Sequence, residues 1–182
     1  MIRADLLLVV DLQRALVTGE HAVPGAAGFL DRIGSVLAAA RAGGAPVVHL
    51  QDDGDHLITK GTDGWRLALP ADAGEQVVAK AHDDGFAGTD LDAVLRSSRA
   101  RRICLAGIQS EMCVAATARG AIARGYTVVL PRDAHTTYDV PADGSAPAVP
   151  AAHVARVAEW SLGDEVVAPD RASDVVFGPP EP

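Results

Sequence analysis

The sequence has little of what a disulfide framework, a membrane span or a nucleic-acid surface would need. Only two cysteines occur in 182 residues, Cys104 and Cys113, and they form no CxxC pair, so no disulfide is expected. Basic residues number 16 against 24 acidic ones, and the net charge of −8 repels phosphate backbones and anionic lipid surfaces. The apolar runs are far shorter than the roughly 18 residues of a membrane span, and no signal-peptide pattern precedes the first one. We therefore expect a cytoplasmic protein with neither nucleic acid nor a membrane as partner.

The length favours one compact unit. With 48% hydrophobic residues, the chain can bury one core but is short for two, so residues 1–182 are predicted to form a single domain. The tail at 178–182 contains three prolines and is expected to fray.

Short β-branched runs alternate with longer segments rich in Ala, Leu and Arg, which is typical of a parallel sheet covered by helices. Strands are predicted at 5–10, 46–50, 76–79, 102–106 and 126–130, with short ones near 165–167 and 174–177. Helices are predicted at 25–42, 90–98, 114–124 and 150–160. The expected fold class is α/β, a doubly wound, Rossmann-like three-layer fold with a five- to six-stranded parallel sheet. The polar stretch 51–72 is long for a connection and is predicted to be a lid or an interface.

Three reactive side chains stand where strands of such a sheet end. Asp11 follows LLLVV, Lys80 ends QVVAK, and Cys113 follows the loop GIQSEM. The carboxyl ends of parallel strands share one edge, and the first and fourth strands are commonly neighbours where the strand order reverses. We therefore expect Asp11 and Cys113 to flank one crevice, with Lys80 reaching it from the side.

These residue types suit a cysteine nucleophile. A thiol at the start of a helix lies near backbone N–H groups and the positive end of the helix dipole, which predicts a lowered pKa for Cys113. Asp11 can accept the thiol proton, and Lys80 can keep Asp11 ionised. Cys104 lies within a strand and is predicted to be a core residue, and His135 is predicted to have a structural role.

Three blocks of the sequence resemble the signature blocks of the isochorismatase-like cysteine hydrolases. They are LLVVDLQ, VVAKAHDDGFAGTDLDAVL and AGIQSEMCVAATARGAIARGYTVVLPRDAHTT, and the resemblance spans about residues 4–140. It implies a six-stranded parallel sheet, an Asp–Lys–Cys triad at Asp11, Lys80 and Cys113, and hydrolysis of a small amide through a thioester. It also implies a cis peptide between Ile108 and Gln109, with the backbone amides of Gln109 and Cys113 forming an oxyanion hole.

Two departures from the family's variants narrow the expectation. Isochorismatases that cleave a vinyl ether lack the cysteine, so Cys113 favours acyl transfer. Metal-binding members carry Asp-x-His after the second strand, whereas Asp52-Asp53-Gly54 stands here, with only His49 and His56 nearby. We therefore predict an enzyme that needs no metal and no other cofactor.

The remaining expectations concern partners and alternatives. Gln13, Trp65 and Phe86 are candidates for lining a small-molecule pocket, and the two aromatic residues could instead lie in a subunit interface of a homo-oligomer. A catalytically silent binding or scaffold protein is the main alternative function. A flavodoxin-like nucleotide binder is disfavoured because DLQRALV, without a glycine-rich turn, follows the first strand.

Overall fold

The computed structural model describes residues 1–54 and 58–180. Its strands are β1 (Ile2–Ala4), β2 (Leu6–Val10), β3 (Val47–Asp52), β4 (Gln76–Lys80), β5 (Arg102–Ile108), β6 (Thr127–Val129), β7 (His135–Thr136), β8 (Val166–Val167) and β9 (Val175–Phe177). Its helices are α1 (Arg14–Val17), α2 (Ala26–Ala42), α3 (Leu91–Ser97), α4 (Ala115–Ala123) and α5 (Ala151–Trp160). Four short turns complete the list: η1 (Gly19–His21), η2 (Ser110–Val114), η3 (Gly163–Glu165) and η4 (Ala172–Asp174).

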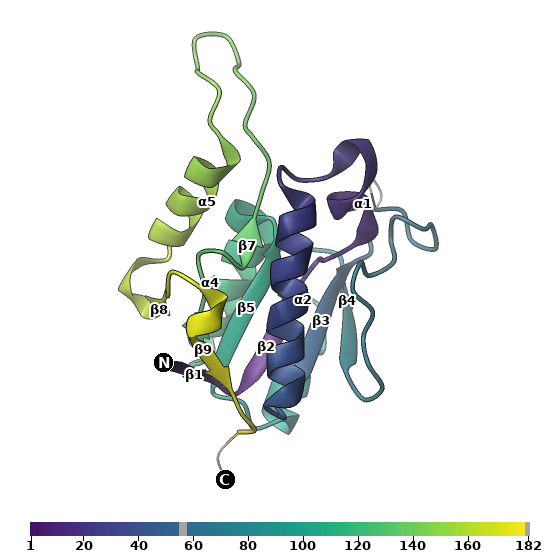
Figure 1. Cartoon of the computed structure of the whole chain (residues 1–182), viewed down its shortest axis with the longest axis vertical. Helices are drawn as coiled ribbons and strands as arrows, with labels where there is room; N and C mark the ends of the chain where they lie inside the picture. The colour runs from purple at the N-terminus through teal and green to yellow at the C-terminus, as the bar shows by residue number, and fades with distance from the viewer. Residues whose placement is uncertain (55–57, 181–182) are drawn as a thin grey trace.

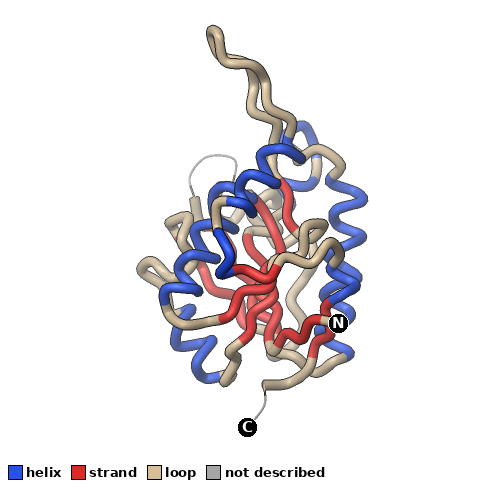
Figure 2. Tube along the Cα trace, turned by 90° about the vertical axis from the view of Figure 1, so that its left-hand side faces the viewer, coloured by secondary structure: helices blue, strands red, loops and turns tan. Residues whose placement is uncertain are grey.

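The main sheet is parallel and lies between two layers of helices (Figure 1, Figure 2). Its strand order is β4-β3-β2-β5-β6-β8, and the short β7 pairs with the end of β5. The first strand of this sheet, β2, is thus hydrogen-bonded to both β3 and β5, all in parallel register. The predicted α/β class and the predicted neighbourhood of the first and fourth strands are confirmed.

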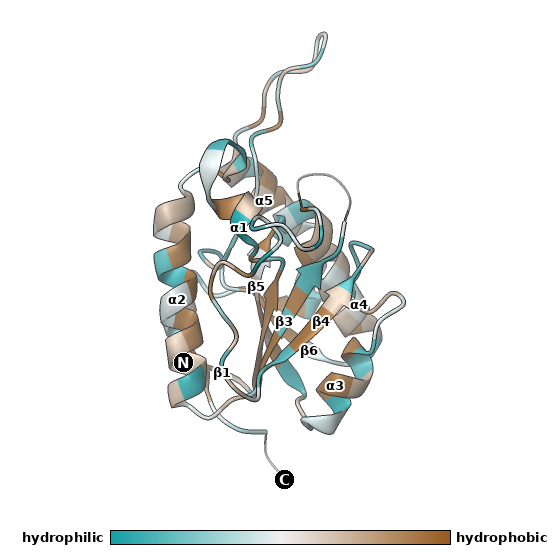
Figure 3. Cartoon of the chain, turned by 90° about the vertical axis from the view of Figure 1, so that its right-hand side faces the viewer, coloured by the Kyte–Doolittle hydropathy of each residue, from teal (hydrophilic) through white to brown (hydrophobic). Residues whose placement is uncertain are grey.

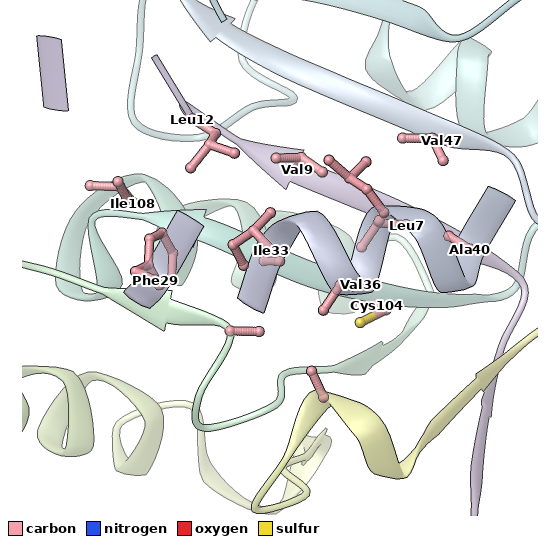
Figure 4. Close-up of a cluster of buried hydrophobic side chains, with 14 of the residues drawn as sticks. Leu7, Val9, Leu12, Phe29, Ile33, Val36, Ala40, Val47, Cys104 and Ile108 are labelled. Carbon is pink, nitrogen blue, oxygen red and sulfur yellow. The ribbon is translucent and has the colours of Figure 1, made fainter. Parts of the chain in front are cut away.

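Side-chain alternation along β2 divides the core in two. Leu7 and Val9 pack on the α2 side, and Leu6, Leu8 and Val10 pack on the opposite side with α3 and α4. The apolar positions of α2 recur at helical spacing and face the sheet, namely Phe29, Ile33, Val36, Leu37 and Ala40. Figure 4 shows this packing around Ile33, and Figure 3 shows apolar residues, in brown, along the strands, beside helices that carry both apolar and polar residues.

The chain ends depart from the prediction. The predicted strand near 174–177 does not join the main sheet, because β9 pairs in parallel with β1 as a separate two-stranded sheet. Gly43 ends α2 and permits this arrangement, since a Cβ there would lie 2.4 Å from the carbonyl oxygen of Phe177. The tail is also tied down further than expected: Gly178 N–H donates to Ala4 O and Arg3 donates to Pro179 O.

Two connections stand out. The segment between β7 and α5 extends away from the body as a narrow hairpin, closed by a bridge between Val140 and Val149 (Figure 1). The described part of the predicted lid packs back over the end of β2, where Ala68 N–H donates to Leu12 O and Ala15 N–H donates to Gly64 O. In the described part of the chain, no helix combines the length and apolarity needed to cross a membrane.

Candidate active site

Asp11, Lys80 and Cys113 meet at the carboxyl edge of the sheet. Lys80 Nζ lies 2.7 Å from Asp11 Oδ2 and donates to Cys113 Sγ at 3.3 Å. Asp11 is 2% exposed and Lys80 is 3% exposed. Since β3 lies between β4 and β2, the long stem of Lys80 is what lets its ammonium reach Asp11. The three side chains that the sequence singled out are therefore in contact.

The backbone at the end of β2 is shaped to present Asp11. Asp11 has a φ of 48°, in the left-handed region that non-glycine residues seldom occupy and that is often found at functional sites. Beside it, Gly107 of β5 is paired with Val10 in the sheet register. A Cβ on Gly107 would lie 2.0 Å from Val10 O, so only glycine allows β2 and β5 to run this close immediately before Asp11.

Cys113 lies in η2, a single π-type turn between β5 and α4. The Ile108–Gln109 peptide bond that leads into this turn is cis. Gln109 O accepts hydrogen bonds from the N–H groups of Met112 and Val114, and Met112 has a non-helical φ of −105° and ψ of −106°. The nucleophile candidate therefore stands in an irregular turn before the helix proper.

This position reverses one prediction. Burial raises the pKa of the Cys113 thiol, and the charge of Asp11 raises it further, while Lys80 opposes the rise only in part. The helix-dipole argument failed because the thiol is buried, because a carboxylate lies beside it, and because Cys113 precedes α4 inside the π turn. The resting thiol is therefore neutral at neutral pH and needs a base to become a nucleophile.

Asp11 has the properties of that base. Burial raises the pKa of Asp11 from 3.8 to about 6, and the Lys80 charge limits the rise. Burial would lower the pKa of Lys80, but the charge and hydrogen bond of Asp11 and the charge of Asp52 raise it, and the pKa lies above its ordinary value. At neutral pH the site thus holds an ionised Asp11, a charged Lys80 and a neutral thiol.

Two contacts that the sequence did not predict hold the Cys113 turn. Ser110 Oγ and His135 Nδ1 are hydrogen-bonded at 2.8 Å in a buried position, and Thr137 Oγ1 donates to Glu111 Oε1 at 2.8 Å. Burial lowers the pKa of His135 to about 4, so its imidazole is neutral. Both partners come from the β7 region, about 25 residues beyond the turn, and sequence spacing carries no signal for such a pairing.

The pocket candidates lie in three different settings. Gln13 is fully buried, and its side chain joins Asp52 N–H, Asp52 O and Trp65 O, so it braces the backbone beside the triad. The Trp65 ring is half-buried and its Nε1 donates to Asp53. Phe86 is 5% exposed and stacks on Tyr126 inside the core. The prediction that Phe86 lines a pocket or a subunit interface is therefore wrong, because its ring is packed in the core and is accessible to neither.

The residues considered for metal binding are engaged elsewhere or not described. His49 Nε2 is hydrogen-bonded to Glu75 Oε2 at 3.0 Å, and Asp53 pairs with Lys60. His56 lies outside the described residues. Within residues 1–54 and 58–180, no group of three or more His, Cys, Asp or Glu side chains is arranged to hold a metal ion.

Comparison with known proteins adds three findings. The family model of the isochorismatase domain matches residues 5–160. Two streptothricin hydrolases of Streptomyces noursei are 52% and 51% identical over 179 and 176 residues, which is 96% and 94% of this chain but only 65% and 70% of those proteins. The crystal structure of a cysteine hydrolase from Pseudomonas syringae pv. phaseolicola superposes with a TM-score of 0.84 at 26% identity, covering 94% of this chain and 89% of that one.

Proposed function

Because this chain belongs to the isochorismatase family, we propose that it is a cysteine hydrolase that cleaves an amide or related C–N bond of a small molecule, without a metal. The observation that carries the proposal is the contact of one ammonium group, Lys80 Nζ, with both Asp11 Oδ2 and Cys113 Sγ. A buried carboxylate that can act as base, an ammonium that holds it and a thiol, all in contact, are the parts that covalent acyl transfer requires.

In the proposed reaction, Asp11 takes the proton of the Cys113 thiol as the sulfur attacks the substrate carbonyl. The tetrahedral oxyanion is stabilised by the backbone N–H groups of Gln109 and Cys113, and each such donor is typically worth about 3 kcal/mol of barrier. Asp11 then returns its proton to the departing amine, and a thioester remains on Cys113. Water hydrolyses the thioester with Asp11 again acting as base. Lys80 holds Asp11 in place and keeps it ionised before the thiol attacks and again before water attacks the thioester.

For the substrate we propose streptothricin or a close analogue. Sequence identity of 52% and 51% to two streptothricin hydrolases supports this choice. The chain spans about two thirds of the length of those relatives.

The test combines product analysis with two cysteine variants. The wild type should hydrolyse streptothricin to products whose masses together exceed that of streptothricin by one water, and Cys113→Ala should lower the rate at least about 10³-fold because the thioester step has no substitute. Cys104→Ala is the matched control: Cys104 is fully buried in the core, and its loss should leave the rate per folded molecule nearly unchanged. Full activity of a folded Cys113→Ala protein would overturn the mechanism.

The competing function, a silent binding or scaffold protein, predicts a different result. Such a protein would bind streptothricin or another small molecule without forming a thioester. Rapid quenching during turnover, followed by peptide mass analysis, should find an acyl group on Cys113 if the enzyme proposal is right. Binding without either product or adduct would favour the silent protein.

We also propose a homo-oligomer. Val157 and Trp160 on α5 are 64% and 74% exposed, and exposed large apolar side chains on one helix favour burial against another subunit. Light scattering coupled to size exclusion would settle the state, and a mass equal to one chain of 18.8 kDa would reject it.

A further inference from the structure

Asp83 is a carboxylate placed beside the candidate nucleophile. Its Oδ1 accepts a hydrogen bond from the Cys113 thiol at 3.6 Å, and the Asp83 side chain is exposed to solvent. The loop that carries Asp83 is anchored to α4, because the buried Thr117 hydroxyl donates to Asp83 O and accepts from Gly85 N–H. The neighbouring Asp84 is used differently: its Oδ1 accepts from Phe86 N–H within the same turn. Asp83 is therefore held at the sulfur by its backbone.

The charge of Asp83 is unfavourable for the reaction unless something compensates it. Lys80 supplies positive charge to the site, but it is already paired with Asp11, and Asp52 also acts on both groups as a negative charge. Among the described residues, the buried Asp11 Oδ1 has no hydrogen-bond partner, so hydrogen bonds compensate the negative charge of Asp11 only in part. A thiolate or oxyanion that forms next to Asp83 is repelled by it. With a neutral substrate this repulsion only raises the barrier.

We propose that Asp83 determines specificity by pairing with a cationic group, such as a protonated amine, that the substrate carries close to the reacting carbonyl. The inference rests on the proposed function and adds the charge class of its substrate. A substrate cation would neutralise Asp83, remove its repulsion from the developing oxyanion and orient the carbonyl over Cys113 Sγ. The ion pair between Asp83 and the substrate cation stabilises both the bound substrate and the transition state. Loss of the Asp83 charge therefore raises KM and lowers kcat/KM.

The first test needs no turnover, because it measures how electrophiles of different charge react with Cys113. Three reagents alkylate the same sulfur: cationic (2-bromoethyl)trimethylammonium, neutral iodoacetamide and anionic iodoacetate. The ratio of the alkylation rates of the cation and the anion is independent of the reactivity of the thiol. Dividing this ratio by the one for free cysteine removes the intrinsic difference between the reagents. Cys104 is fully buried and does not compete, which peptide mass analysis verifies. The wild type should prefer the cation over the anion relative to free cysteine.

Asp83→Asn should lower this cation-to-anion ratio about tenfold, the effect expected for one charge a few ångströms from the sulfur. Asp84→Asn is the matched control, because it removes the same formal charge one residue away while its amide oxygen can still accept from Phe86 N–H. It should change the ratio less than about twofold. Equal ratios in the wild type and Asp83→Asn, or equal effects of the two variants, would overturn the proposal.

The second test uses substrates. Among amides that differ only in a free or an acetylated amine, the wild type should hydrolyse the free-amine form with the higher kcat/KM, and Asp83→Asn should lose that preference. The two arms separate this inference from the proposed function. If Cys113 proves not to be a hydrolytic nucleophile, the alkylation ratios still report on Asp83. If hydrolysis occurs without any charge preference, Asp83 has no such role and the hydrolase proposal stands.

Discussion

Replacing Lys80 with methionine tests the electrostatic arrangement of the triad. Methionine keeps most of the side-chain volume and removes only the ammonium that lies 2.7 Å from Asp11. Two opposite charges at that distance attract by about 6 kcal/mol at an effective dielectric constant of about 20, and even a third of this would raise the pKa of Asp11 from about 6 to above 7. In the variant, Asp11 should therefore be protonated at pH 7.

The change in stability should depend on pH in a definite direction. The pKa of Asp11 is raised in the folded state, so the folded protein binds the Asp11 proton more tightly than the unfolded chain does, and stability falls as the pH rises from about 4. In the wild type this loss levels off above about pH 6, whereas without Lys80 it continues to higher pH. The contribution of Asp11 to the free energy of unfolding then differs between the two proteins by about 1.4 kcal/mol at pH 7 and by almost nothing at pH 5.

Urea unfolding at pH 5 and pH 7 measures this difference. Lys80→Met should lose about 1.4 kcal/mol more at pH 7 than at pH 5, relative to the wild type at each pH. The control is the same substitution in an Asp11→Asn background: compared with Asp11→Asn alone, Asp11→Asn/Lys80→Met should lose equal stability at pH 5 and pH 7. If Lys80→Met were destabilised equally at both pH values, Asp11 would not be the group responsible, and the charge assignment of the triad would be wrong.

Three further predictions follow from the site. The value of kcat/KM should fall tenfold per pH unit below about pH 6, because protonated Asp11 cannot act as base, and a pH profile without an inflection near 6 would point to another base. Gly107→Ala should destabilise the protein by roughly 2–5 kcal/mol in urea unfolding, because the new Cβ would lie 2.0 Å from Val10 O. A loss of stability below about 1 kcal/mol would contradict the close approach of β2 and β5. Incubation with EDTA should leave activity unchanged, and elemental analysis should find no stoichiometric zinc, iron or manganese; activity lost to the chelator and restored by one of these ions would refute metal independence.

Much of the fold was readable because it depends on local patterns. The continuous apolar run Leu6–Val10 predicts a strand buried on both faces, and the spacing from Phe29 to Ala40 predicts a helix with one apolar stripe. The pairing of β9 with β1 could not be predicted from the sequence, because it joins residues more than 170 positions apart and depends on the close approach of Gly43 to Phe177. Short strands at the chain ends carry too few residues for their pattern to specify a partner.

The sequence by itself determined the α/β class and identified Asp11, Lys80 and Cys113 as site candidates. The carboxyl ends of parallel strands lie at one edge of the sheet, and these three residues are reactive types at or just beyond such ends. Tertiary structure alone decided how these groups are charged. The same thiol has a low pKa at an open helix start and a raised one when it is buried beside Asp11. Likewise, Phe86 is a core residue and Asp83 a neighbour of the sulfur only because β4, α4 and the Cys113 turn pack together. Burial and charge separation are properties of distances between segments, and no single segment of the sequence contains them.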